Sequence, residues 1–230
     1  NLFFDFIDLA KELQPKVVVA ENVSGLMMGA ARDYVRKIYV AFKDAGYQLR
    51  IEPYLLDAST MGVPQRRKRV FFIALRNDLA DNFMEQVDMF QTAPKLELEF
   101  NENEIPFKNV YFDLIDRKLT PACLNLWYNK IDSDNDLGSI NERLFKSPTY
   151  FGFKFTKMDE VNKTIIANDN TVLFNYPRLL NKIELCNIGT YPQDYNFLKL
   201  KPEYLIGMSV PPVMTAQIAS NIYTQWISKL

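Results

Sequence analysis

Two short segments of the chain carry side chains that could act on a nucleic-acid base. Glu21, Asn22 and Val23 directly follow the apolar run 17–20, and residues 65–69 lead into the apolar run 70–74. A partly desolvated carboxylate at a strand end can hydrogen-bond a ring nitrogen and its neighbouring amino group, or pass a proton to them. Guanidinium groups and an amide suit phosphate oxygens and base carbonyls.

Each segment also has a purely structural interpretation. Glu21 could be a turn acid that accepts hydrogen bonds from nearby backbone amides. Four consecutive basic residues beside a strand could be a solvated edge that discourages aggregation. If the segment is extended, alternate side chains share a face, which groups Gln65 with Arg67 and Arg69, and Arg66 with Lys68.

Composition limits the classes of function. The chain has 230 residues, is 48% hydrophobic and carries a net charge of −1, so its overall charge neither supports nor excludes nucleic acid. It has no histidine, which excludes histidine-based triads and predicts no metal site. Cys123 and Cys186 are far apart in the sequence and indicate a reducing compartment.

The chain has no apolar run of the roughly 20 residues that span a bilayer, so we expect a cytoplasmic protein with no membrane contact. Its first residue, Asn1, already falls within a predicted helix. We therefore expect that the natural protein begins upstream.

Periodicity predicts an α/β arrangement for residues 1–78. A helix should run from Leu2 until Gln14-Pro15 stops it, and the short apolar run 16–20 is typical of a strand buried on both faces of a parallel sheet. Asp33 can cap a second helix that ends near Gly46. Residues 48–56 and 69–75 should form two further strands.

The pattern changes after this region. From 79 to 177 the sequence has an acidic stretch, 97–104, and short aromatic-rich pieces between polar turns, which indicates a separate small lobe. Helical spacing returns at 178–188, and a last helix is expected from 212 to about 230.

Five motifs occur in the order and spacing of the conserved blocks of DNA cytosine-5 methyltransferases. Glu21-Asn22-Val23, then Leu56-Asp57-Ala58, then the segment 62–69 resemble the sixth to eighth blocks. The ninth block is similar to Arg178-Leu179-Leu180, Glu184, Tyr191-Pro192 and Tyr195, and the tenth to Gly207-Met208-Ser209-Val210-Pro211-Pro212.

The resemblance implies part of a Rossmann-like, S-adenosylmethionine-dependent methyltransferase sheet with a small inserted target-recognition lobe. Residues 1–78 would be the second half of the catalytic domain, residues 79–177 the target-recognition domain, and residues 178–230 the return to the catalytic domain. The implied substrate is cytosine in double-stranded DNA, flipped out of the helix.

The resemblance also implies residue roles. Glu21 would contact N3 and the exocyclic amine of the flipped cytosine and favour attack at C6, in a pocket shaped by Asn22 and Val23. Arg67 and Arg69 would hold the nucleotide and its flanking phosphates, and Gln65 would fix their orientation. The S-adenosyl-L-methionine pocket would be closed by Met208, Ser209 and Val210.

The sequence departs from this family in ways that matter. The reaction needs a cysteine thiolate to add to C6, yet no Pro-Cys pair and no Gly-x-Gly cofactor turn is present. Cys186 is better explained as a small buried residue. Met208 replaces an asparagine and Thr190 replaces a glycine. We therefore expect that a complementary N-terminal segment or chain supplies the nucleophile.

Several basic residues are candidates for contact with DNA. The stretch 149–157 interleaves aromatic residues with lysines and could read base edges in the major groove, or form a strand that packs its aromatic side chains inward. The acidic stretch 97–104 should face away from DNA. The predicted DNA-binding residues are Arg66, Lys68, Arg143, Lys146, Lys154 and Lys157.

The sequence thus favours a DNA cytosine-5 methyltransferase of the restriction-modification or phage type, inactive without its missing segment. A non-catalytic DNA-binding subunit, a transfer-RNA cytosine-5 methyltransferase and an unrelated α/β interaction domain stay open as alternatives.

Overall fold

The computed structural model describes residues 2–27, 29 and 31–230, which fold as two compact units. Unit 1 contains the described residues of the ranges 1–57, 68–99 and 217–230, and unit 2 contains residues 58–67 and 100–216.

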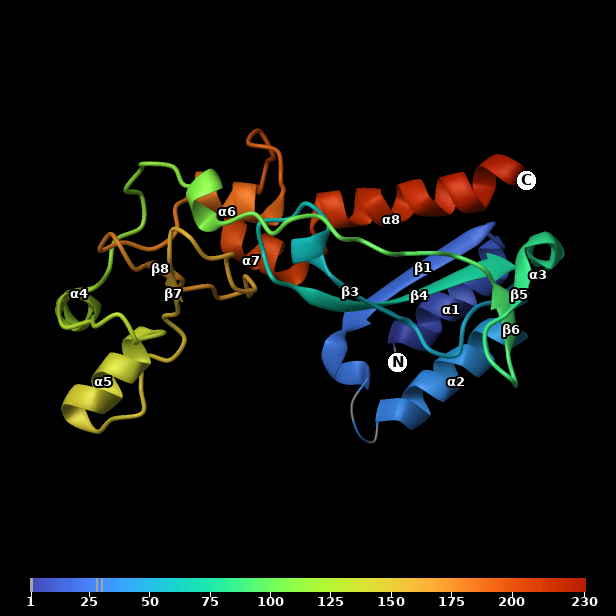
Figure 1. The fold of residues 1–230 in the computed structure, drawn as a ribbon, viewed down its shortest axis with the longest axis horizontal. Helices are drawn as coiled ribbons and strands as arrows, with labels where there is room; N and C mark the ends of the chain where they lie inside the picture. The colour runs from blue at the N-terminus through green and yellow to red at the C-terminus, as the bar shows by residue number, and fades with distance from the viewer. Residues whose placement is uncertain (1, 28, 30) are drawn as a thin grey trace. The chain divides into compact units, whose positions relative to one another are not determined.

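Unit 1 is built on a sheet whose central strand is β4 (Lys68–Arg76). On one side β4 pairs with β1 (Val17–Val23), and it also pairs with the short strands β2 (Tyr47–Gln48) and β3 (Tyr54–Asp57). All three pairings are antiparallel. Figure 1 shows β1 and β4 side by side as the two long arrows of this sheet.

Two helices cover one face of the sheet. α1 (Leu2–Leu13) and α2 (Ala31–Asp44) place Ile7, Ile38 and Phe42 in a core with the alternate residues of β1 and β4 that point to the same side. Pro15 follows α1, and Gly46 follows α2 with a φ of +91°, a backbone conformation that glycine adopts at no steric cost.

The rest of unit 1 is a hairpin and the end of the chain. Two short helices, α3 (Asn77–Ala80) and η3 (Asp81–Phe83), lead into β5 (Met84–Gln86) and β6 (Thr92–Pro94), which pair antiparallel. The chain returns to unit 1 at residue 217, within α8 (Pro212–Gln225), and ends after η5 (Ile227–Lys229). Between them Trp226, 1% exposed, donates from Nε1 to the carbonyl of Lys95.

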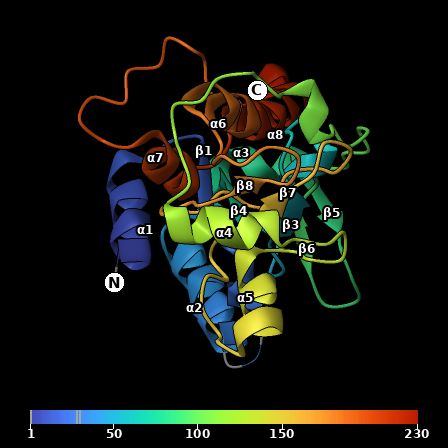
Figure 2. The same ribbon diagram turned by 90° about the vertical axis from the view of Figure 1, so that its left-hand side faces the viewer.

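Unit 2 has short elements joined by long ordered loops. Its helices and strands are η2 (Ala58–Thr60), η4 (Phe107–Asn109), α4 (Pro121–Tyr128), α5 (Leu137–Phe145), β7 (Phe155–Thr156), β8 (Val172–Leu173), α6 (Lys182–Gly189) and α7 (Pro202–Met208). Figure 2 shows α4 and α5 next to each other, and both contribute to one core cluster with Trp127, Leu137 and Val172. A second cluster is built around α6 and α7.

Several expectations about the elements were wrong. β1 is not buried on both faces of a parallel sheet: it pairs antiparallel with β4, and Val19 and Val23 are 41% and 56% exposed while Val18 and Ala20 are buried. The predicted strand 48–56 is two short strands, because Pro53 lies between them and has no amide hydrogen for a ladder. Asp33 lies in the first turn of α2, not at its cap.

The two compact units do not coincide with the predicted lobe 79–177. Residues 79–99 belong to unit 1, where Phe83 and Lys95, which flank the β5–β6 hairpin, both contact Trp226. Residues 178–216 belong to unit 2 with the α6–α7 core. Which residues recognise the target therefore stays a prediction. Within the described residues, no helix is both long and apolar enough to cross a membrane.

Candidate functional site

The carboxylate of Glu21 is held by Arg69 across the β1–β4 ladder of unit 1. The Nε atom of Arg69 lies 2.9 Å from Oε1 of Glu21, and the two side chains are 15% and 32% exposed. The register places Val23 opposite Arg69 and Glu21 opposite Phe71, so the ion pair is a diagonal contact on one face of the sheet. Both side chains are therefore partly sheltered from solvent, and neither is fully buried.

The sequence placed Glu21 just after its strand, and this was wrong because the ladder continues through Val23. The next two residues are at the same end of β1. Oδ1 of Asn22 accepts a hydrogen bond of 2.8 Å from the backbone N–H of Val23, whose side chain is 56% exposed. Their role in a base pocket stays a prediction.

Gln65 and Arg67 form a buried brace inside unit 2. Oε1 of Gln65 accepts the N–H of Ile165 at 3.0 Å, while Nη1 of Arg67 donates to the carbonyl of the same residue at 2.9 Å. Nη2 of Arg67 donates to the carbonyl of Gly207 at 2.8 Å. Gly207 leaves no room for a side chain, because a Cβ would lie 2.3 Å from the backbone carbon of Ile166. The brace thus fixes the end of α7 against the 165–167 segment.

This position corrects the expectation that Gln65 and Arg67 project from an exposed face. They are 1% and 2% exposed, because the backbone of residues 65–66 runs alongside 162–164 and both side chains turn inward to the main chain of Ile165. Arg69, in unit 1, is the arginine that stays accessible beside Glu21. Sequence periodicity groups side chains by face but does not say which segment will cover that face.

The residues after the brace were predicted to close a cofactor pocket. Met208 is 67% exposed, and Ser209 and Val210 are half-buried just beyond α7. Oγ of Ser209 donates to the carbonyl of Ile206 at 3.0 Å. The Arg67–Gly207 hydrogen bond holds the backbone directly before these residues, and their role in closing a cofactor pocket stays a prediction.

The predicted DNA-binding cations have different environments. Arg66 makes a bidentate pair with Glu104, both contacts at 2.9 Å, so the acidic stretch expected to avoid DNA holds one of the residues expected to bind it. Arg143 pairs with Asp134 at 2.8 Å. The Nζ atom of Lys157 donates to the carbonyl of Asp132.

The other three predicted cations carry no ion pair within the described part of the chain. Lys68 and Lys146 are exposed, and Lys154 is half-buried.

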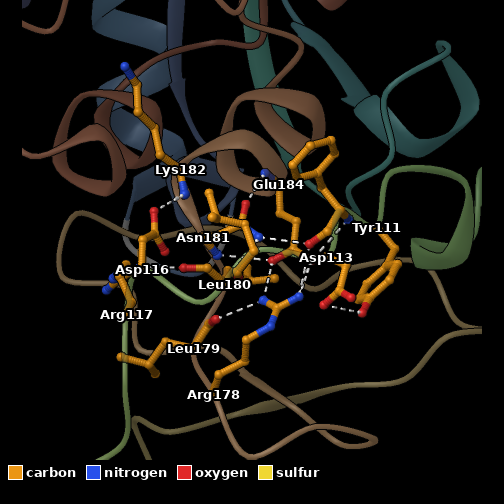
Figure 3. Close-up of polar contacts among 12 residues, drawn as sticks. Tyr111, Asp113, Asp116, Arg117, Arg178, Leu179, Leu180, Asn181, Lys182 and Glu184 are labelled. Atoms are coloured by element: carbon orange, nitrogen blue, oxygen red, sulfur yellow. Dashed lines mark hydrogen bonds and ion pairs between the residues drawn. The ribbon is translucent and has the colours of Figure 1, made fainter.

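A buried ion-pair network near the start of α6 was not predicted as a unit. Arg178 and Glu184, 3% and 0% exposed, are joined by two hydrogen bonds of 2.7 and 2.8 Å. Figure 3 shows the guanidinium facing the carboxylate, with Asn181 beside them. Asn181 and Glu184 also form a capping box at the start of α6, a pattern that the spacing Asn-x-x-Glu could have revealed.

The charge of this network is stabilised by its own contacts. Burial by itself would lower the pKa of Arg178, but the hydrogen bonds and charge of Glu184 outweigh it and raise that pKa above its usual value. The aromatic ring of Tyr111 lies 5.5 Å from the guanidinium. The network ties the 111–116 segment to α6, since Asn181 also donates to the carbonyls of Phe112 and Leu114.

Neither cysteine has the setting of a nucleophile. Cys123 and Cys186 are 2% and 0% exposed and form no disulfide. Burial raises the pKa of the Cys186 thiol, although the nearby charge of Lys182 acts in the opposite direction. The interpretation of Cys186 as a small buried residue is confirmed. Among the described residues, no group of acidic or cysteine side chains is arranged to hold a metal ion.

Comparison with known proteins identifies relatives for nearly the whole chain. Residues 1–224 match the model of the C-5 cytosine-specific DNA methylase family. The type II methyltransferase M.NgoPII of Neisseria gonorrhoeae is 35% identical over 125 residues, which are 54% of this chain and 34% of that protein. The type II methyltransferase M.NgoFVII of the same organism is 25% identical over 244 residues, 96% of this chain and 62% of that protein.

The fold is also similar to a solved structure. A protein described as a DNA modification methyltransferase, encoded within an Escherichia coli prophage, superposes with a TM-score of 0.64 at 20% identity, over 97% of this chain and 73% of that one. The predicted α/β methyltransferase fold is thereby confirmed. The chain spans 34% and 62% of the lengths of the two curated relatives named above.

Proposed function

This chain belongs to the C-5 cytosine-specific DNA methylase family, and we propose that it is the base-holding part of a DNA cytosine-5 methyltransferase of the restriction-modification or phage type. In this proposal it works in the cytoplasm on double-stranded DNA with S-adenosyl-L-methionine as methyl donor. The observation that carries the proposal is the Glu21–Arg69 pair, a carboxylate and a guanidinium fixed 2.9 Å apart on adjacent strands and partly open to solvent.

Glu21 is proposed to bind N3 and the exocyclic amine of the target cytosine. The contact with Arg69 uses one side of one carboxylate oxygen, and a carboxylate has about four acceptor sites. One remaining site can accept the N–H of the amine, and a proton that the other oxygen takes up from solvent is shared with N3 and withdraws electron density from the ring. The ring then becomes more susceptible to a thiolate at C6.

Arg69 is proposed to orient Glu21 and to contact the flipped nucleotide. Extrusion of a base from the duplex costs a few kcal/mol, which contacts to the base and backbone must offset. Arg67 and Gln65 are proposed to act indirectly instead, because their polar groups bond to main-chain atoms of Ile165, Ile188 and Gly207. They would hold in place the segment that precedes Met208, Ser209 and Val210.

The methyl donor supplies an electrophilic methyl group on a sulfonium. Met208, Ser209 and Val210 fit the task of closing its pocket, since they follow a fixed helix end and keep accessible surface. Asn22 and Val23 are proposed to line the base pocket at the end of β1.

A complementary N-terminal segment or chain is proposed to bring the cysteine nucleophile. Two features of unit 1 suit such a partner. Among the described residues β1 pairs only with β4, so its second edge has unpaired backbone groups. The exposed face of α1 carries an apolar stripe at helical spacing, formed by Leu2, Phe6, Leu9 and Leu13, which are 39–87% exposed.

The test is methyl transfer by a reconstituted mixture. The 230-residue chain is combined with a family N-terminal segment that carries Pro-Cys and Gly-x-Gly, then incubated with duplex DNA and methyl-labelled S-adenosylmethionine. We expect transfer to DNA only when both parts are present. Glu21→Gln should lower the rate by about 100-fold or more, in the range of lost proton-transfer catalysis, and change DNA affinity little.

Glu52→Gln is the matched control, because Glu52 is an exposed glutamate of the same unit. Equal losses of rate and affinity in Glu21→Gln, or an equal loss of rate in the control, would remove Glu21 from the proposed role. DNA binding without transfer in every mixture would favour a non-catalytic DNA-binding subunit. Preferential methylation of structured RNA in competition would favour an RNA substrate.

A further inference from the structure

The loop of residues 146–153 in unit 2 is held in a defined shape, although it contains no regular element. It connects α5 to β7 and follows the yellow helix α5 in Figure 1. Two of its non-glycine residues, Lys146 and Tyr150, have φ values of 55° and 67°. Such left-handed conformations are unfavourable for these residue types and persist only where surrounding contacts maintain them.

Asn141 supplies the main polar contacts. This side chain on α5 is 7% exposed, and its Nδ2 donates to the carbonyl of Ser147 at 3.0 Å and to Oγ1 of Thr149 at 2.8 Å. Both donor positions of the amide are therefore directed into the loop. Backbone hydrogen bonds of 2.9 Å from Thr149 to Ser147 and of 3.0 Å from Phe153 to Tyr150 complete the fold of the loop.

Apolar packing fixes the other side of the loop. Phe151 lies directly on Gly138 of α5, where an added Cβ would be 2.5 Å from the ring and 2.7 Å from the backbone nitrogen of Phe151. A residue larger than glycine at position 138 would therefore prevent this close approach of helix and loop. The rest of the Phe151 side chain stays accessible, at 47% exposure.

The outer surface of this loop carries groups that suit a nucleic acid. Thr149 accepts the amide hydrogen of Asn141, so its own hydroxyl hydrogen must point to Ser147, 3.5 Å away, or to solvent. Tyr150 is 37% exposed. The segment 143–157 contains four Lys or Arg residues and no Asp or Glu, in a chain whose net charge is −1.

Resting on the proposed function, we propose that the 146–153 loop reads base edges in the major groove of duplex DNA and that Asn141 is its positioning residue. Thr149 donates a hydrogen bond to a base acceptor, and Tyr150 packs against a neighbouring base edge. Lys146 contacts a phosphate, because a lysine supplies charge without sequence information. Arg143 and Lys157, already held by Asp134 and Asp132, do not provide this contact.

The experiment measures binding of the 230-residue chain to a pool of fluorescent random-sequence duplexes. The bound fraction is sequenced, and affinities for the enriched and the unselected duplexes are compared. Asn141→Ala and Thr149→Val should reduce the preference for the enriched sequence by about tenfold or more, with little change on the unselected pool. Thr149→Ser should retain the preference, since it keeps the hydroxyl.

Two further variants are needed. One tests the contribution of charge to DNA affinity, and the other shows whether any substitution near the loop changes sequence preference. Lys146→Ala should weaken binding to both pools and reduce the dependence of log affinity on log salt by about 1. Asn129→Ala is the matched control, because its side-chain amide donates to the carbonyl of Asn125 at its own helix end and, within the described part of the chain, to no residue of the loop; it should leave the preference unchanged. Thermal melting identifies any variant that fails to fold, in which case the remaining loop variants decide.

The outcomes separate this inference from the proposed function. Methyl transfer in the reconstituted mixture together with an unchanged preference in every folded loop variant would overturn only the role of the loop. Lost preference in the loop variants without methyl transfer in any mixture would overturn only the catalytic proposal. No sequence preference in the parent chain, or tighter binding to structured RNA than to duplex DNA, would overturn the loop proposal.

Discussion

Replacement of Glu184 by glutamine should destabilise unit 2 strongly. Oε1 of Glu184 accepts from Arg178 and from the N–H of Phe112, and Oε2 accepts from Arg178 and from the N–H of Asn181, at distances between 2.7 and 3.3 Å. The amide NH2 of a glutamine would face two donors in either orientation. It would also leave the buried charge of Arg178 without its counter-ion.

The magnitude follows from burial. Removing one partner of a buried ion pair costs about 3–5 kcal/mol, so Glu184→Gln should lower the free energy of unfolding by that amount. The same substitution at Glu104, whose pair with Arg66 is exposed on the surface of the same unit, should cost about 1 kcal/mol or less. The two substitutions have the same chemistry and differ in burial.

The chain allows each unit to be followed separately in urea unfolding. It has two tryptophans, Trp127 in unit 2 and Trp226 in unit 1, so Trp226→Phe leaves fluorescence that reports unit 2 alone. In that background Glu184→Gln should lower the midpoint by about 1–2 M for an m-value of about 3 kcal/mol per M. A loss below about 1 kcal/mol, equal to that of Glu104→Gln, would refute the assignment of a dry, tightly held ion pair.

Three more predictions concern single features. Thr190 ends α6 with a φ of 56°, so Thr190→Gly should be more stable than Thr190→Ala by about 1 kcal/mol in thermal melting, and the reverse order would contradict this conformation. Burial of the Cys186 thiol, with its raised pKa, should prevent modification by a disulfide reagent at mildly alkaline pH until urea unfolds the chain; rapid labelling of the native protein would contradict it. The hydrogen bond from Arg66 lowers the pKa of Glu104 below its usual value of 4.5. At pH values above 4.5, Arg66→Ala should therefore lower the free energy of unfolding by at most about 1 kcal/mol, and this loss should shrink as the pH falls through the lowered pKa of the folded state. A loss of stability that grows in acid would be inconsistent with the pair.

The elements of unit 1 were largely predictable from local sequence. Apolar runs located β1 and β4, helical spacing located α1 and α2, and Pro15 and Gly46 marked the ends of the helices. The antiparallel partnership of β1 with β4 was not predictable, since an apolar run indicates burial and not the direction of its neighbour.

The site was predictable in part. The resemblance singled out Glu21 and Arg69, and the structure places them in contact. The resemblance also singled out Gln65 and Arg67. A run of basic residues predicts an exposed segment, and only the fold shows that residues 162–165 cover these two side chains. The pattern of charges in a sequence cannot distinguish an arginine that binds phosphate from an arginine that donates to buried main-chain carbonyls.

Unit 2 was the least predictable part. Its helices α4 and α5 are short, and its strands are two residues long, so neither helical nor strand periodicity has room to appear. The ordering of the 146–153 loop depends on Asn141, whose spacing to Ser147 and Thr149 has no sequence signature.

We propose that this chain holds the cytosine on which a partner segment acts. The most direct measurement is mass spectrometry of the nucleosides released from duplex DNA after incubation with the reconstituted mixture and S-adenosylmethionine. We expect 5-methyl-2′-deoxycytidine with the parent chain, and its loss when the chain carries Glu21→Gln or when either part is omitted. Methylation at another base or ring position, or undiminished 5-methyl-2′-deoxycytidine with Glu21→Gln, would contradict it.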